Sequence, residues 1–152
     1  MLPKYHILIS MLFSFSVWLI FPNIGFYTFA IFFSSVFIDV DHYLVYVKRK
    51  KDFNLKRAAN YFLEFHKQLK KSIRKRKKVK APLVVFHTIE FLLLVAVFSL
   101  FSKLVFFILI GFLFHSLLDI IDIYLEFGTL SVRYFSLISY LINKDKTDIK
   151  QL

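Results

Sequence analysis

The sequence contains no cysteine, and it has only three glycines and three prolines in 152 residues. Without cysteine the chain can form no disulfide and offers no thiolate to a metal, and its redox compartment cannot be inferred. Polar residues are also scarce outside one block, since 58% of the residues are hydrophobic and 21 are phenylalanine. A soluble domain of this length needs a polar surface, so the composition indicates a membrane protein.

Hydrophobic residues run together in four segments that are long enough to cross or nearly cross a bilayer, which takes about 17–25 residues. These segments cover residues 5–21, 24–40, 82–101 and 104–127. Pro22-Asn23 separates the first two and Ser102-Lys103 the second two, so each pair is predicted to form an antiparallel helical hairpin. The first segment lacks a cleavage signature, and we interpret it as a retained helix. The predicted fold is therefore an all-α integral membrane protein with a single domain over 1–152.

Most of the positive charge lies between the two hairpins, at residues 48–80. Apolar side chains recur there every three or four residues, at Leu55, Ala59, Phe62, Phe65, Leu69 and Ile73. This spacing predicts a basic amphipathic helix that lies on the membrane surface and binds anionic lipid headgroups. The run Arg74-Lys75-Arg76-Lys77-Lys78 is also typical of nucleic-acid sites, but beside a membrane helix it favours lipid, and no nucleic-acid partner is predicted.

The basic residues are distributed unequally between the two sides of the predicted membrane segments. Of the 21 lysines and arginines, only Lys103 falls in a connection on the far side. The positive-inside rule then places both termini and the basic helix in the cytoplasm. After Gly128, a plausible helix stop, the spacing of Leu130, Tyr134, Leu137, Ile138 and Leu141 predicts a short C-terminal interfacial helix.

Ionisable residues are unusually frequent in the predicted membrane helices. A charged side chain costs about 2.5–3.5 kcal/mol there, so such residues usually mark function. The chain places six carboxylates and four histidines within or at the ends of these helices: Asp39, Asp41, Glu90, Asp119, Asp122 and Glu126, with His6, His42, His87 and His115. Spacings of three and four residues put them on common helix faces. Closing both hairpins brings the groups toward the cytoplasmic ends, so one shared site is predicted.

The residue types predict a metal site. Imidazole and carboxylate without thiolate suit zinc, the metal we expect first, or manganese or iron. The predicted ligands are His6, Asp39, Asp41, His42, His87, Glu90, His115 and Asp119, and Asp122 is the predicted general base. Taken singly, His6 is also explained as an interfacial histidine, Asp41-His42 as a helix cap, and Asp122 as a support for a ligand. We interpret Glu126 as an interfacial carboxylate and His66 as a solvated residue of the basic helix.

The order of these residues resembles a known family. His6 is followed by Asp39-x-Asp41-His42, by His87 in a membrane segment, and by Gly111-x-x-x-His115-x-x-x-Asp119. This pattern, over about residues 5–125, resembles the YdjM-like family of prokaryotic membrane-bound metal-dependent hydrolases. That family is in turn similar to zinc-dependent phospholipase C, an all-helical enzyme with His, Asp and Glu ligands. The resemblance implies a multi-pass protein of the prokaryotic cytoplasmic (inner) membrane.

The chain departs from the family at the start of the third segment. The family usually has an arginine and a Thr-His-Ser cluster there, whereas this sequence has Val85-Phe86-His87-Thr88-Ile89-Glu90. Only His87 matches, and Glu90 is predicted to be a substitute ligand.

The predicted function is metal-dependent hydrolysis of a phosphoester on a lipid or lipid-linked substrate. An alternative is an ion or proton carrier that uses the same residues. Carriers usually place their sites at the bilayer midplane in broken helices, whereas these polar groups lie toward one side. A third possibility is an anchoring or assembly protein that docks partners through residues 48–80, but it leaves the intramembrane histidines and carboxylates unexplained.

Overall fold

The computed structural model describes residues 3–75 and 82–143, and these form helices and loops without a strand. The elements are α1 (Pro3–Ile20), the 3₁₀ helix η1 (Pro22–Ile24), α2 (Tyr27–Phe37), α3 (Val40–Lys50), α4 (Leu55–Arg74), the 3₁₀ helix η2 (Val85–His87), α5 (Ile89–Ser99), α6 (Lys103–Phe127) and α7 (Leu137–Asn143). The all-α prediction is therefore confirmed. The end of the predicted basic helix and the end of the basic tail lie outside the described residues.

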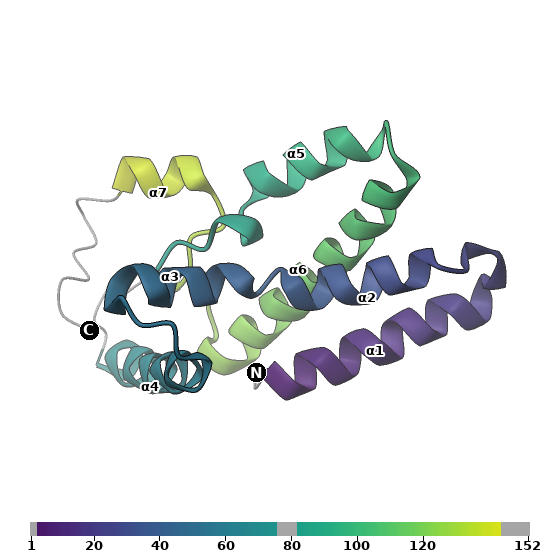
Figure 1. Ribbon diagram of the computed structural model, residues 1–152. Coiled ribbons are helices and arrows are strands. Elements are labelled where there is room, and N and C mark those ends of the chain that lie inside the picture. The colour runs from purple at the N-terminus through teal and green to yellow at the C-terminus, as the bar shows by residue number, and fades with distance from the viewer. Residues whose placement is uncertain (1–2, 76–81, 144–152) are drawn as a thin grey trace.

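The helices pair as the turn signals predict. α1 and α2 lie side by side and antiparallel, α5 and α6 form a second hairpin, and α6 crosses against α2 (Figure 1). Ser102 caps the start of α6, where its side chain accepts the backbone N–H of Val105. Gly128 ends α6 with a φ of 68°, a left-handed conformation that glycine adopts without strain.

The second predicted helix does not end at residue 40. The chain bends at Ile38 and Asp39 and continues as α3, so that residues Tyr27–Lys50 form one long rod with a break. The apolar run ends at Val40, but Asp41 in the first turn of α3 suits the positive end of a helix, and the chain remains helical. The end of a hydrophobic run was therefore mistaken for the end of a helix.

The third predicted helix begins later than expected. Residues 82–84 are not helical, η2 follows, and Thr88 caps α5 by accepting the backbone N–H of Phe91. At 11 residues α5 is about 16 Å long, well short of a hydrocarbon core of about 30 Å. Two helices, Tyr27–Lys50 and Lys103–Phe127, are long and apolar enough to cross a membrane, whereas α1 and α5 are shorter apolar helices.

A close contact between α2 and α6 fixes the position of these two helices relative to each other. A Cβ atom at Gly111 would overlap the hydroxyl of Ser34 and the carbonyl of Ile31, so only glycine allows this approach. The neighbouring hydroxyls of Ser10 and Ser35 are 2.7 Å apart and join α1 to α2. His115 lies one turn after Gly111, and this packing therefore determines its position relative to the α2–α3 break.

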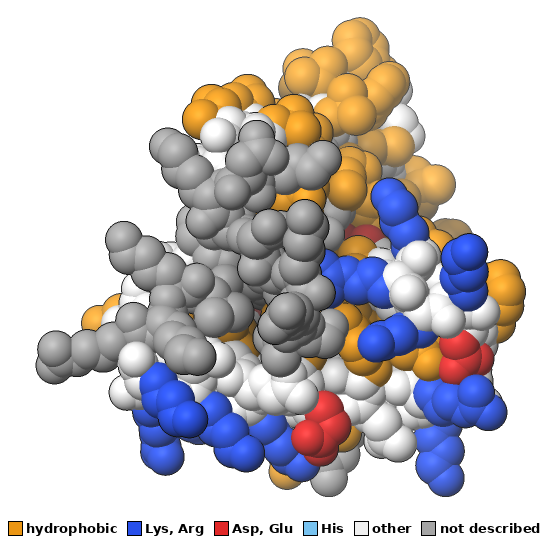
Figure 2. Space-filling view, turned by 90° about the vertical axis from the view of Figure 1, so that its left-hand side faces the viewer, with side chains coloured by type: hydrophobic (Ala, Val, Ile, Leu, Met, Phe, Trp, Pro, Cys, Tyr) orange, Lys and Arg blue, Asp and Glu red, His pale blue; other side chains and the backbone are white. Residues whose placement is uncertain are grey.

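The basic segment, predicted as one helix over 48–80, contains α4 at Leu55–Arg74, whereas residues 48–50 end α3 and residues 51–54 form a loop. The apolar face of α4 lies against the protein. Phe65 and Leu69 form a buried cluster with Ile123 of α6 and Val132 of the following loop. Lysine and arginine side chains gather on the lower part of the face that holds α3 and α4, while hydrophobic side chains lie above them (Figure 2). The sequence pattern predicted which residues form the apolar face of α4, but it did not predict that other parts of the protein cover this face. The C-terminal helix, predicted from about residue 130, begins only at Leu137.

A candidate metal centre at the helix break

Most of the predicted site residues come from four parts of the chain that lie close together near the α2–α3 break. The break between α2 and α3 supplies Asp39, and the first turn of α3 supplies Asp41 and His42. α1 supplies His6, η2 supplies His87, and α6 supplies His115 and Asp119. His115 and His87 are almost completely buried, whereas Asp39 is partly exposed. The helix break therefore brings an acidic segment against histidines from two other helices and the η2 turn.

Three imidazoles surround one oxygen of Asp39. The Nε2 atom lies 3.4 Å from Asp39 Oδ1 in His115, 3.6 Å in His87 and 3.7 Å in His42. The acidic residue at the end of this hydrophobic helix therefore lies among histidines of α3, η2 and α6.

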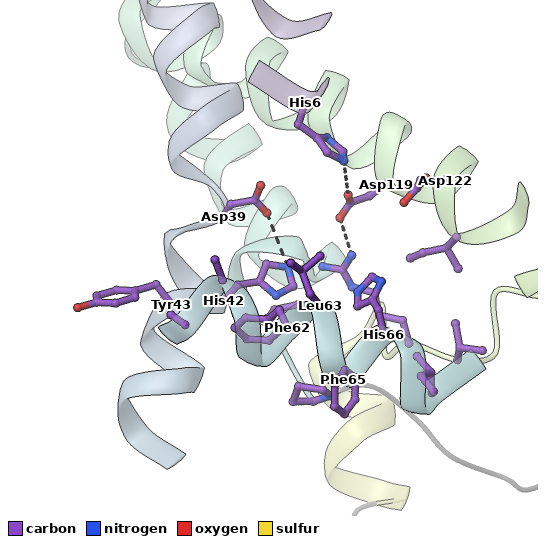
Figure 3. A pocket seen from close by; sticks show the side chains of 18 of the residues that line it. His6, Asp39, His42, Tyr43, Phe62, Leu63, Phe65, His66, Asp119 and Asp122 are labelled. Atoms are coloured by element: carbon purple, nitrogen blue, oxygen red, sulfur yellow. Dashed lines mark hydrogen bonds and ion pairs between the residues drawn. The ribbon is translucent and has the colours of Figure 1, made fainter. Parts of the chain in front are cut away.

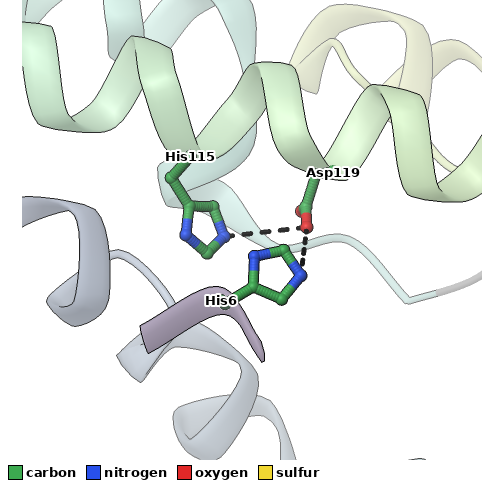
Figure 4. Close-up of side chains that lie close together, drawn as sticks. All are labelled: His6, His115 and Asp119. Carbon is green, nitrogen blue, oxygen red and sulfur yellow. Dashed lines mark ion pairs between the residues drawn. The ribbon is translucent and has the colours of Figure 1, made fainter. Parts of the chain in front are cut away.

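Asp119 faces the same space from α6. Its Oδ1 atom is 3.7 Å from Nε2 of both His6 and His115, and its Oδ2 atom is 3.6 Å from Nε2 of His87. The side chains of His6, His115 and Asp119 point toward one another (Figure 4). His115 thus lies between the two carboxylates.

Groups with these separations could hold a metal ion. The separations exceed the 2.7–3.2 Å that is usual for an N–H···O hydrogen bond. Ligands placed tetrahedrally at about 2.0–2.1 Å from zinc lie about 3.3–3.4 Å from one another. Among the described residues, three groups have ligand atoms within 4.8 Å of one another: His6–His115–Asp119, Asp39–His87–His115 and Asp41–His42–His87. Since neighbouring groups share a histidine, the arrangement can hold one ion or two.

Buried polar atoms without partners point to the same conclusion. Nε2 of His87 and both ring nitrogens of His115 are buried and lack a hydrogen-bond partner among the described residues. Leaving such an atom unpaired costs about 1–3 kcal/mol. A metal ion would satisfy the Nε2 atoms, and the donor set of imidazole and carboxylate fits zinc, manganese or iron.

Asp41 orients His87. Its Oδ2 atom lies 3.1 Å from Nδ1 of His87 and accepts the backbone N–H of Phe86 at 2.9 Å. A proton on Nδ1 leaves Nε2 as the lone-pair nitrogen that faces Asp39 and Asp119. Such carboxylate–histidine pairs fix the tautomer of metal ligands. The predicted ligand Asp41 thus contacts His87 as well as belonging to the group Asp41–His42–His87.

Glu90, a predicted ligand, belongs to none of the three groups, and its carboxylate has partners elsewhere. Its carboxylate accepts the hydroxyl of Ser136 at 2.6 Å and the backbone N–H groups of Leu137 and Ile138 at 2.9 and 3.2 Å. His87 precedes the cap of α5, so the two residues do not share one helix face. Glu90 instead holds the start of α7.

Asp122 and Glu126 are the other two carboxylates of α6. Asp122 lines the cavity described below but belongs to none of the three groups. Glu126 lies 3.6 Å from Nζ of Lys70 and 3.8 Å from Nδ1 of His66, so it joins α6 to α4. Burial lowers the pKa of His66, which was predicted to be a solvated residue. Its side chain is 44% exposed, so the residue stays partly solvated while it contacts Glu126.

Sequence reasoning missed Arg133, which was counted among the charges of the cytoplasmic tail. Its side chain is only 7% exposed, and its Nη1 donates to Oδ2 of Asp119 at 2.5 Å. A single arginine among Val132, Tyr134 and Phe135 was the available signal, because an isolated charge in an apolar segment needs a buried partner.

A cavity of about 350 Å³ opens onto the centre (Figure 3). Asp39, His42 and Asp119 lie at its polar end, and apolar side chains of α4, including Phe62 and Leu63, line its wall. Ligand sites of proteins have volumes of about 300–1,000 Å³, so the cavity can admit a small molecule.

Comparisons with protein-family models, with curated proteins and with solved structures found no match to this chain. Its function is therefore inferred from the residues of the centre, from the cavity beside it and from the pattern of the sequence.

Proposed function

We propose that this protein is a membrane-bound metal-dependent hydrolase, of the YdjM-like kind, that cleaves a phosphoester of a lipid or lipid-linked substrate. The observation that carries the proposal is the convergence of four histidine Nε2 atoms on the carboxylates of Asp39 and Asp119 at 3.4–3.7 Å. An apolar cavity at the edge of this cluster supports a substrate with a hydrocarbon part.

The proposed metal ligands are His6, His115 and Asp119 on one side and Asp39 and His87, which share His115, on the other. His42 lies beside Asp39 as a further ligand. Zinc is the first candidate, and manganese or iron are alternatives. A divalent ion bound there would generate a nucleophile from water at neutral pH and polarise a phosphoryl oxygen. Asp41 holds His87 in the tautomer with a free Nε2 atom, and Arg133 holds one oxygen of Asp119 so that the other faces His6 and His115.

Asp122 is the proposed general base. It lies three residues after Asp119 on α6 and lines the same cavity. An ionised carboxylate that does not bind the metal can accept the proton of the attacking water.

We further propose that the chain crosses the prokaryotic cytoplasmic membrane more than once, with both termini in the cytoplasm. Both hairpin turns lie away from α4 (Figure 1), and Lys103 is the only basic residue at these turns. The positive-inside rule then assigns the α4 end to the cytoplasm. Exposed lysines of α4, such as Lys67 and Lys70, would contact anionic headgroups at that surface.

The activity of the purified protein tests the hydrolase. Protein in a neutral detergent should hydrolyse a short-chain phosphatidic acid or a related phosphoester, lose activity with a chelator and recover it with zinc or manganese. Asp122→Asn should lower kcat while leaving the metal content unchanged. The control Glu64→Gln, at an exposed carboxylate, should change neither kcat nor the metal content. Bound metal without hydrolysis of any lipid phosphoester would contradict the hydrolase and favour the ion carrier.

A further inference from the structure

Arg133 has more hydrogen-bond donors than its protein partners use. Nη1 donates to Asp119, but Nε and Nη2 are buried and have no hydrogen-bond partner among the described residues. A lysine at this position would serve Asp119 equally well as a counter-ion. The guanidinium adds a planar fork of donors, and this geometry suits an oxyanion that accepts two hydrogen bonds at once.

The loop that carries Arg133 is fixed in place. Val132 and Tyr134 on either side are buried, and the carbonyl of Phe135 accepts the backbone N–H of Ile89 at 2.9 Å. Glu90 holds the next residues through Ser136 and the start of α7. The guanidinium is therefore positioned before any ligand binds, which reduces the entropy lost on binding.

The lining of the cavity indicates which kind of ligand the guanidinium of Arg133 would bind. Arg133 is the only lysine or arginine among the described residues that line it, and it lies with the carboxylates and histidines of the metal centre. Phe62, Leu63 and Leu69 of α4 line the apolar part (Figure 3 shows Phe62 and Leu63). A ligand that fits both parts has an oxyanion at one end and a hydrocarbon chain at the other.

The negative charge at the polar end of the cavity determines when an anion can bind. Asp39, Asp119 and Asp122 all line the cavity and would repel an anion. A divalent ion held by Asp39 and Asp119 would offset two of these charges, and Arg133 would then supply a positive charge beside the site. Anion binding is therefore expected in the metal-loaded protein.

We propose that Arg133 binds the phosphate oxygens of an amphipathic phosphoester whose hydrocarbon chain lies along α4. This proposal rests on the hydrolase function and adds the group that holds the substrate's phosphate. Arg133 acts as a substrate-binding residue, and its contact with Asp119 places it within reach of the reacting phosphate.

Binding of hexylphosphonate, whose carbon–phosphorus bond the enzyme cannot hydrolyse, tests the proposal without relying on activity. Zinc-loaded protein in neutral detergent is titrated calorimetrically with hexylphosphonate, inorganic phosphate or hexanol. The phosphonate should bind at least about tenfold more tightly than inorganic phosphate, and hexanol should not bind measurably. Equal binding of inorganic phosphate would overturn the amphipathic ligand and leave a site for free phosphate.

Arg133→Lys keeps the positive charge but removes the fork, and it should weaken hexylphosphonate binding about tenfold or more at an equal zinc content. Arg57→Gln, at an exposed arginine of α4 outside the cavity, is the matched control and should bind normally. A folded, zinc-loaded Arg133→Lys protein that binds the phosphonate like the wild type would show that Arg133 is only a counter-ion to Asp119.

Ala59→Phe keeps the proposal testable if Arg133 variants fail to fold. Ala59 lines the cavity from α4, and a ring there should weaken hexylphosphonate binding while inorganic phosphate still binds. Unchanged phosphonate binding would contradict the assigned place of the chain. Wild-type protein that takes up no zinc would instead contradict the hydrolase itself, so the two failures can be told apart.

Discussion

Nδ1 of His87 lies 3.1 Å from Oδ2 of Asp41, which joins the segment before α5 to the start of α3. The same carboxylate oxygen accepts the backbone N–H of Phe86, so both the ring and its backbone are held. Because Nδ1 is engaged, Nε2 is left to face Asp39 and Asp119. This contact brings together two residues of the candidate centre that are distant in sequence.

Substitution of Asp41 by Asn should weaken zinc binding about 10–100-fold without abolishing it, because the amide holds the His87 tautomer less firmly than a carboxylate. The affinity is measured by competition with a chromophoric chelator. Asp52→Asn, at a carboxylate beside the start of α4, is the control and should bind zinc normally. Complete loss of zinc would instead make Asp41 a direct ligand, and unchanged affinity would contradict the orienting role.

Glu90→Gln should leave the zinc content unchanged, since Glu90 holds α7 and not the metal. Loss of the negative charge weakens its three hydrogen bonds, so the amide groups of Leu137 and Ile138 should exchange with solvent deuterium faster than in the wild type. Mass spectrometry of peptides from this region would measure the change. Loss of zinc with unchanged exchange would restore Glu90 as a ligand.

Gly111→Ala should destabilise the protein by about 1–3 kcal/mol, the usual cost of overpacking, because the new methyl group meets Ser34 and the carbonyl of Ile31. Denaturation in detergent followed by circular dichroism would measure this loss. Leu113→Ala, at an exposed position of the same helix, is the control and should cost less. A Gly111→Ala protein as stable as the wild type would contradict the close α2–α6 contact.

The absence of cysteine allows the proposed orientation to be tested with single cysteines. In intact cells, a membrane-impermeant maleimide should label Asn23→Cys and Ser102→Cys, at the two hairpin turns, but should label Lys67→Cys on α4 only after permeabilisation. Labelling of Lys67→Cys alone would reverse the orientation.

The sequence predicted the helical class, the two hairpin turns and most of the residues that gather at the centre. The predictions that failed share a physical cause, because hydrophobic periodicity describes a single helix and not what packs against it. The break at Asp39, the late start of α5 and the position of Glu90 depend on local caps and bends. The burial of Arg133 depends on Asp119, fourteen residues away, across a loop that has no periodic pattern.

Metal content tests the central claim most directly. Wild-type protein purified at about pH 7.5 should carry about one or two equivalents of zinc, manganese or iron by mass spectrometry of the elements. His115→Ala and Asp119→Ala should lose most of it, whereas Glu64→Gln, at an exposed carboxylate of α4, should keep it. Only neutral imidazole binds metal, so the content should fall as the pH drops through the imidazole range, about 6–7.

The contradicting result is equally direct. Wild-type protein that is folded, contains no metal and takes up neither zinc nor manganese at neutral pH would show that the convergence of His6, His42, His87 and His115 on Asp39 and Asp119 is not a metal centre. Binding of one or two equivalents that disappears in His115→Ala and survives in Glu64→Gln is the result that the geometry predicts.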